Sequence, residues 1–389
     1  MDRNNKFKLI AVSISVLSSK SIPLIVGVFL VSKLSAEDFN SWTYLIYLAL
    51  VFSAAVNNKL NTDFARKYTG KNNTIIPFYF NKYDLHYIVL LFLFIGFLFF
   101  KKGLFLGIIF SGISALLPTY NYFSQYLRFA KKYSFLIFFG VFRVALFLPI
   151  LFFGQISLNK IVLFYFLSVL TPIFFVLFKF KLEIVKGDLN NDTIFLFVYG
   201  FLMALSSNIE KFILEWVDYD GFIYANLNYM LFLVSLVTIV NEVTKKVLLP
   251  EMYLELNTAG VISKKMLNLR RRSLGILFVI SVMVPYIFYI GLFKLGLTPS
   301  WFELSSPSLF LLLSMSYGVS LAYSYYNVIY FKFKKVKVLI GVQVIYILIF
   351  IVAMMFEDSL SVIVIFKALS LVWLGVSLQA RDAVTKYLY

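Results

Sequence analysis

The chain contains no cysteine, a single histidine (His86) and few charged residues. Without cysteine there is no disulfide bond, thiolate metal site, iron–sulfur cluster or cysteine nucleophile, and one histidine excludes a histidine-rich metal site. Charged residues make up 14% of the 389 positions, whereas a soluble domain carries about a quarter. The composition therefore excludes a water-soluble protein, and we assign no catalytic residue, metal site or cofactor.

Apolar residues dominate instead, with 61% hydrophobic and 19% aromatic positions. A helix needs about 20 such residues to cross the hydrocarbon core of a bilayer. The first apolar run follows Arg3, Lys6 and Lys8 without a cleavage site, so we interpret it as a retained span and not as a signal peptide. We predict an all-α polytopic membrane protein with about twelve transmembrane helices. The expected spans are 9–32, 39–57, 79–100, 103–127, 134–153, 160–178, 194–217, 222–243, 273–293, 304–331, 337–356 and 359–380.

The charge is strongly positive, with 36 Lys and Arg against 19 Asp and Glu and a formal net charge of +17. When the N-terminus is placed in the cytoplasm, most of the basic residues fall in cytoplasmic loops, as the positive-inside rule requires. An even number of spans then places both termini in the cytoplasm. Because the basic residues are scattered over short loops, we predict no nucleic-acid partner. The longest loop, 244–272, is expected to form an interfacial helix on anionic lipid.

The two halves of the sequence resemble each other weakly. Segment 38–44 matches 218–224 in its acidic, aromatic and final tyrosine positions, and 126–132 matches 330–335. Six spans in each half give parallel repeats related by a pseudo-two-fold axis, a plan typical of secondary transporters with a binding site between the halves. The predicted domains are an N-terminal six-helix bundle at 1–178, a cytoplasmic linker at 179–193 and a C-terminal six-helix bundle at 194–389.

Ionisable residues lie within the predicted spans, where a central Lys or Arg exposed to lipid costs about 2.5 to 3.5 kcal/mol. These residues must therefore face protein or water. Pro23 is expected to kink the first span and to free the carbonyl of Ser19. Excess positive charge in an intramembrane cavity favours an anionic, phosphate-bearing ligand. The predicted binding residues for a diphosphate or anionic glycolipid are Lys20, Arg143, Lys211 and Lys367.

Lys211 and Glu210 each have two interpretations. Lys211 has local partners in Asn208 and Glu215, so it could form an ion pair near the outer interface. Glu210 could couple transport to an ion because a buried carboxyl can exchange a proton, or it could be the fixed partner of one of the lysines. We predict Glu210 and Asn208 as the candidate ion-coupling residues, with H⁺ or Na⁺ as the coupling ion.

Three stretches carry a resemblance to a known family: Leu34-Ser35-Ala36-Glu37-Asp38-Phe39, Asn208-Ile209-Glu210-Lys211-Phe212-Ile213-Leu214 and Asp220-Gly221-Phe222-Ile223-Tyr224-Ala225. Together with the twelve spans they resemble the polysaccharide and O-antigen repeat-unit flippases, which belong to the multidrug/oligosaccharidyl-lipid/polysaccharide exporter superfamily. The sequence departs from the family at Asn40-Ser41, where the family usually shows a glycine.

The resemblance implies a transporter, not an enzyme, with two V-shaped lobes, a cationic central cavity and alternating access. The implied cargo is an undecaprenyl-diphosphate-linked oligosaccharide, moved from the cytoplasmic to the periplasmic leaflet of the bacterial inner membrane for lipopolysaccharide or other surface polysaccharide synthesis. The lipid bilayer, and a polymerase and chain-length proteins of the same pathway, are the implied partners of a monomer.

Two other functions remain open. A multidrug and toxin extrusion exporter would share the fold, but its cationic cargo favours an acidic cavity. A polysaccharide polymerase, ligase or polyprenyl-phosphate glycosyltransferase usually needs a substantial periplasmic loop, whereas every predicted outer loop here is short.

Overall fold

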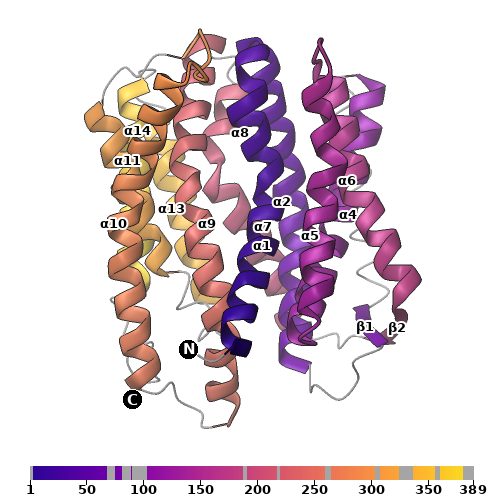
Figure 1. The fold of residues 1–389 in the computed structure, drawn as a ribbon. Coiled ribbons are helices and arrows are strands. Elements are labelled where there is room, and N and C mark those ends of the chain that lie inside the picture. The colour runs from indigo at the N-terminus through magenta and orange to yellow at the C-terminus, as the bar shows by residue number, and fades with distance from the viewer. Residues whose placement is uncertain are drawn as a thin grey trace. The chain divides into compact units, whose positions relative to one another are not determined.

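The computed structural model describes residues 3–67, 75–80, 89, 103–186, 191–216, 220–258, 264–302, 307–323, 336–354 and 360–379. The first part of the chain forms α1 (Arg3–Ile25), η1 (Val26–Leu30), η2 (Val31–Lys33), α2 (Ala36–Lys67), β1 (Ile75–Phe80), α4 (Leu104–Phe129), α5 (Tyr133–Phe147), η3 (Leu148–Phe152), α6 (Leu158–Lys179) and β2 (Lys181–Lys186) (Figure 1). The second part forms α7 (Asn191–Ser207), α8 (Ile209–Trp216), α9 (Gly221–Thr258), α10 (Lys264–Lys294), α11 (Pro307–Tyr323), α13 (Val336–Met354) and α14 (Leu360–Gln379).

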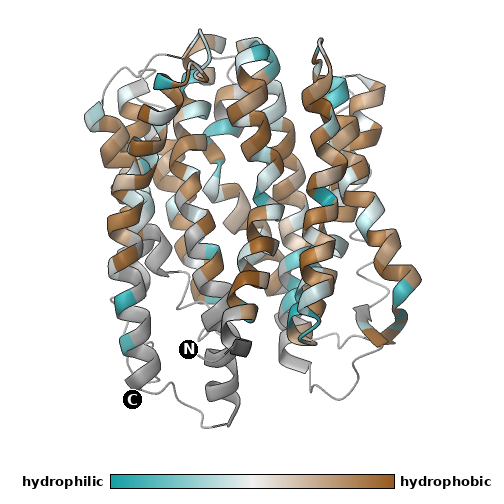
Figure 2. Ribbon diagram, viewed as in Figure 1, coloured by the Kyte–Doolittle hydropathy of each residue, from teal (hydrophilic) through white to brown (hydrophobic). Residues whose placement is uncertain are grey.

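Hydrophobic residues, coloured brown, predominate along the coloured parts of the helices (Figure 2). By length and composition, four helical stretches in the described part of the chain can each cross a membrane: Ala36–Asn61, Leu104–Phe129, Tyr133–Phe152 and Leu158–Lys179. A bent pair in α1 makes a fifth if it counts as one span. The helical membrane character is confirmed. The number twelve and the side on which the termini lie stay predictions, and most of the expected span 79–100 is outside the described residues.

Several predicted boundaries were wrong. The expected span 194–217 is two helices, because α7 ends at Ser207 and α8 begins at Ile209. The helical character predicted for 244–272 is confirmed, but its bounds differ, since α9 continues to Thr258 and α10 begins at Lys264. A helix that leaves the apolar core can continue in a polar environment, so hydropathy marks the buried length of a helix and not its end.

The fold is not entirely helical. β1 and β2 form a two-stranded parallel sheet, in which Ile75 pairs with Lys181 and Phe80 with Lys186. The prediction placed these residues in loops and at the start of a span. Parallel strands need a long connection between them, and here that connection includes α4, α5 and α6.

The chain divides by its internal contacts into two units, which we call unit 1 (Met1–Leu34 and Ser41–Leu205) and unit 2 (Ser35–Asn40 and Ser206–Tyr389). Unit 1 contains α1 and α4 to α6, most of α2 and α7, and the sheet. Unit 2 contains the remaining helices together with the segment 35–40, which includes the first turn of α2. The predicted six-helix bundles and their linker at 179–193 stay predictions, because this division follows packing and not membrane topology.

α1 in unit 1 is bent by 52° between Phe7–Ser18 and Lys20–Lys33. The bend lies one turn before Pro23, where the proline ring removes a main-chain donor, so the predicted kink is confirmed. α5 packs closely on this part of α1, because a Cβ atom added at Gly140 would lie 2.9 Å from Cβ and Oγ of Ser18. Glycine at position 140 thus sets the distance between the two helices.

Candidate functional site

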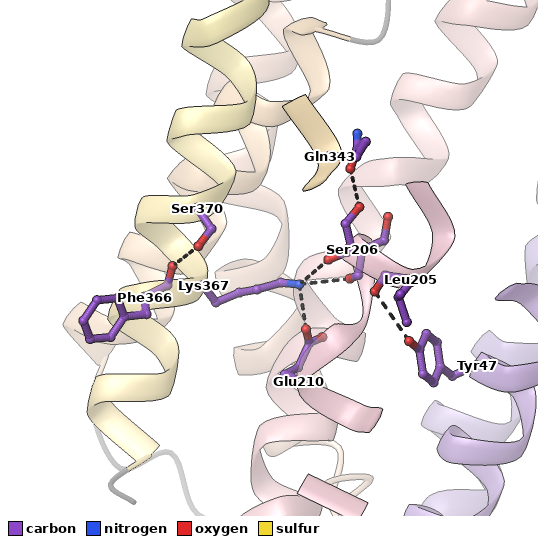
Figure 3. Close-up of polar contacts among 9 residues, drawn as sticks. Tyr47, Leu205, Ser206, Glu210, Gln343, Phe366, Lys367 and Ser370 are labelled. Carbon is purple, nitrogen blue, oxygen red and sulfur yellow. Dashed lines mark hydrogen bonds and ion pairs between the residues drawn. The ribbon is translucent and has the colours of Figure 1, made fainter. Parts of the chain in front are cut away.

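Unit 2 buries an ion pair between Lys367 and Glu210, which lie 157 residues apart in the sequence. Lys367 Nζ in α14 donates to Glu210 Oε2 in α8 over 2.7 Å, and both side chains are at most 2% exposed (Figure 3). The same ammonium donates to the carbonyl oxygens of Ser207 over 3.0 Å and Ser206 over 3.4 Å. Its three N–H groups therefore meet three oxygens.

The break between α7 and α8 presents these carbonyl groups. The last residues of a helix have carbonyl oxygens without an intrahelical donor, and the C-terminal end of the helix dipole is negative. Asn208 lies at the break, and its carbonyl accepts the amide of Lys211 over 3.1 Å. The end of α7 and the Glu210 carboxylate thus form a negative site around the Lys367 ammonium.

Residues of α13 complete the surroundings of the pair. The Gln343 side chain is hydrogen-bonded through Oε1 to the Ser206 hydroxyl, and the ring centres of Tyr346 and Phe350 lie 5.5 and 5.8 Å from Lys367 Nζ. Glu210 Oε1 is buried and has no hydrogen-bond partner among the described residues. Oε2 of Glu210 therefore binds the ammonium, while Oε1 accepts no hydrogen bond from the described residues.

Unit 1 buries a cation of a different kind, the guanidinium of Arg143 in α5, which is 2% exposed. Its Cζ lies 4.6 Å from the centre of the Tyr120 ring and 5.5 Å from that of Tyr165, and Nη2 donates to the Tyr165 hydroxyl over 3.3 Å. Nε has no hydrogen-bond partner, and no carboxylate contacts the guanidinium within the described part of the chain. Among the described residues, two aromatic faces and a tyrosine hydroxyl offset the charge of Arg143.

The rings around Arg143 are themselves held by packing. Tyr120 in α4 stacks on Phe139 at 4.4 Å between ring centres, and Tyr165 in α6 meets Trp42 of α2 edge to face at 5.8 Å. Tyr120 is itself a buried residue of unit 1.

The other predicted site residues are less enclosed. Lys20 lies at the bend of α1 and is partly exposed. Lys211 in α8 is partly exposed and interacts electrostatically with both Glu210 and Lys367. The side chain of its expected partner Glu215 is not among those described. The structure brings Lys367 and Glu210 together, which agrees with the interpretation of Glu210 as the fixed partner of a lysine. Binding of cargo by the predicted residues stays a prediction.

The segment that begins α2 carries a contact that the sequence analysis missed. Asn40 Nδ2 donates to the Gly221 carbonyl over 2.8 Å, and Asn40 Oδ1 accepts from Asn228 Nδ2 over 2.9 Å. Phe39 packs beside it on Tyr229 and Trp301. The Asn40 side chain thus anchors this segment in unit 2.

The described elements match solved transporter structures over almost their whole length. A multidrug resistance MATE family transporter of the MOP superfamily, in an outward-facing conformation, aligns with a TM-score of 0.57 over 99% of this chain and 96% of that chain. MATE in the bent conformation aligns with a TM-score of 0.61 over 99% of both chains. The chain has the MATE fold.

The sequence similarity is low, with 13% and 14% identity to these two transporters, so the match shows the fold alone. A MOP superfamily transporter from Pyrococcus furiosus, described as having a binding pocket of reverse polarity, is 14% identical and aligns with a TM-score of 0.56 over 98% of this chain and 96% of that chain. No protein-family model and no curated protein sequence matches the chain. The structural neighbours named here are all transporters and not enzymes.

Proposed function

We propose that the protein is a multi-pass membrane transporter that works by alternating access and carries an anionic amphipathic solute. The proposed cargo is an undecaprenyl-diphosphate-linked oligosaccharide, moved from the cytoplasmic to the periplasmic leaflet of a bacterial inner membrane. The observation that carries the proposal is Arg143, a buried guanidinium without a carboxylate partner among the described residues. A planar guanidinium with unused donors suits phosphate oxygens.

The charges of unit 2 agree with this assignment. Lys367 and Glu210 neutralise each other, so we assign the positive charge that meets the cargo to Arg143, which contacts no carboxylate among the described residues. A cationic cargo would meet this positive charge at a cost that rises as water is excluded. The neighbour from Pyrococcus furiosus supports the idea that pocket polarity, and with it the cargo, varies within this fold.

Export of drugs or organic cations is the second candidate. It is favoured by the neighbours themselves, since the transporter with a TM-score of 0.57 is a multidrug resistance protein. In this alternative the tyrosines around Arg143 would contact an aromatic drug, and the arginine would only hold them in place.

The two candidates are separated by Arg143→Ala and Arg143→Lys, with Lys160→Ala as the control. Lys160 is a basic residue of the same unit that donates to the Gln155 carbonyl away from Arg143. Each variant is expressed in a bacterium that depends on this protein for its surface polysaccharide, and the leaflet that holds the lipid-linked repeat unit is determined by access to an impermeant reagent.

For a flippase, Arg143→Ala leaves the repeat unit in the cytoplasmic leaflet and lowers surface polysaccharide at least about tenfold, since a charge-assisted hydrogen bond contributes about 1.5 to 3 kcal/mol. Arg143→Lys has an intermediate effect because it keeps the charge and loses the planar fork. Lys160→Ala is unchanged. If all variants keep surface polysaccharide while Arg143→Ala raises accumulation of a cationic dye, the protein is a drug exporter instead.

A further inference from the structure

The ammonium of Lys367 occupies a position whose ligands are all oxygens: one carboxylate oxygen and two main-chain carbonyls at a helix end (Figure 3). Carboxylate and carbonyl oxygens are the ligands of hard cations, and interrupted membrane helices bind Na⁺ through such groups. The charge, the donor atoms and the burial around Nζ are therefore those of a small-cation site.

A purely structural ion pair would usually use both oxygens of the carboxylate, because an unused buried acceptor loses its hydration without replacement. Glu210 instead leaves Oε1 without a partner in the described part of the chain. Two of the three ammonium donors go to α7 carbonyls and only one goes to the carboxylate. Lys367 therefore binds the carbonyl groups at the end of α7 as well as the carboxylate of Glu210.

We propose that Lys367 is a tethered cation that fills a latent monovalent-cation site formed by Glu210 Oε2 and the carbonyls of Ser206 and Ser207. In the wild-type protein the Lys367 ammonium stabilises the break between α7 and α8, and no dissolved ion is needed there. Removing the lysine side chain opens the site, leaves Glu210 Oε2 without the ammonium that it binds, and lets Na⁺ bind there. This inference does not depend on the cargo and is tested without transport.

The experiment uses the full chain purified in detergent, with Na⁺ alone as the probe. Thermal unfolding is followed for wild type and Lys367→Ala in NaCl and in choline chloride at equal ionic strength. Binding saturated about tenfold above Kd stabilises the folded state by about 1.4 kcal/mol, which raises the Tm of a protein of this size by roughly 2 °C. We expect that rise for Lys367→Ala in NaCl and no Na⁺-specific rise for wild type.

Two matched variants test the site itself. Lys367→Met fills the space with an apolar chain and should not respond to Na⁺. The double variant Glu210→Gln with Lys367→Ala removes the carboxylate and should also lose the response. Radioactive Na⁺ should bind Lys367→Ala and neither of these two variants.

Four outcomes overturn the proposal: a Na⁺-specific Tm rise in wild type, an equal rise of Lys367→Ala in choline and sodium, a response that persists in the double variant, or no response at all. If Lys367→Ala is not recovered, Lys367→Ser takes its place. Failure to recover either variant in NaCl, while Lys367→Met is recovered, also overturns the proposal, because Na⁺ then does not replace the lysine.

Discussion

Lys367 in unit 2 lies against a carboxylate and two carbonyl oxygens, whereas Arg143 in unit 1 lies against two tyrosine rings and contacts no described carboxylate. Both cations are at most 2% exposed. A lysine ammonium is a compact, strongly hydrated charge that needs several oxygens when it is buried, while a delocalised guanidinium is weakly hydrated and stacks on aromatic faces. The type of cation thus agrees with the environment that each unit provides.

The difference has a functional consequence. In unit 2, the buried ammonium of Lys367 is paired with Glu210 and hydrogen-bonded to the carbonyls of Ser206 and Ser207 at the end of α7. In unit 1, Arg143 Nε has no hydrogen-bond partner among the described residues, and Nη2 makes one hydrogen bond of 3.3 Å, so the guanidinium has donors left for a ligand. Stability should therefore depend on the cation site of unit 2, and binding of an anion on that of unit 1.

The largest effect is expected for Glu210→Gln, which leaves Lys367 buried without a counter-charge. Removing one partner of a buried pair costs about 3 to 5 kcal/mol. The double variant Glu210→Gln with Lys367→Met should recover much of the loss, because neither side chain is then charged. Thermal unfolding in detergent measures both. Equal Tm values for wild type and Glu210→Gln would show that the pair does not hold unit 2 together.

A smaller loss is expected for Asn40→Ala, in the segment of α2 that belongs to unit 2. The substitution leaves the Gly221 carbonyl and the buried amide of Asn228 without their partner, at a cost of about 1 to 3 kcal/mol. Asn40→Gly removes the same side chain and should be no more stable than Asn40→Ala. A Tm unchanged in both variants would mean that Phe39 and not Asn40 anchors the segment.

Arg143→Met in unit 1 should destabilise less than Glu210→Gln, because it leaves no orphaned carboxylate behind. The loss is limited to the cation–π contacts and one hydrogen bond, about 1 to 2 kcal/mol at most. Thermal unfolding is compared with transport of the same variant, and we expect a small change of Tm with a large loss of activity. A Tm decrease as large as that of Glu210→Gln would assign Arg143 a structural role.

The sequence predicted the helical membrane fold and the burial of Arg143, Glu210 and Lys367, because both follow from local hydropathy. It missed the burial of Lys59, which lies beyond the end of the expected span 39–57. It marked Arg143, Glu210 and Lys367 individually. It could not pair Lys367 with Glu210 or Asn40 with Gly221, since those contacts join residues 157 and 181 positions apart. Such pairings depend on how helices pack, and nothing in one sequence records them.

The break between α7 and α8 did have a local signal. Ser206, Ser207 and Asn208 are consecutive residues whose side chains compete with the helix for main-chain hydrogen bonds. The single span 194–217 was predicted from hydropathy alone, which does not register this competition. The short sheet had no such signal, because Ile75–Phe80 contains a proline and does not alternate between polar and apolar residues. Its pairing with Lys181–Lys186 depends on the fold of unit 1.

The smallest effect is expected for Tyr165→Phe, which keeps the ring over Arg143 and removes only the hydroxyl acceptor at 3.3 Å. A long hydrogen bond of this kind contributes about 0.5 to 1.5 kcal/mol, so the Tm should fall by a few degrees at most. Transport of an anionic cargo should be kept or raised, because the substitution frees a guanidinium donor for phosphate. Tyr165→Leu is the matched comparison, since it removes the aromatic face as well and should reduce both stability and transport. If Tyr165→Phe abolishes transport while its Tm is unchanged, the hydroxyl itself and not the guanidinium contacts the cargo, and the assignment of the unit 1 site to Arg143 is wrong.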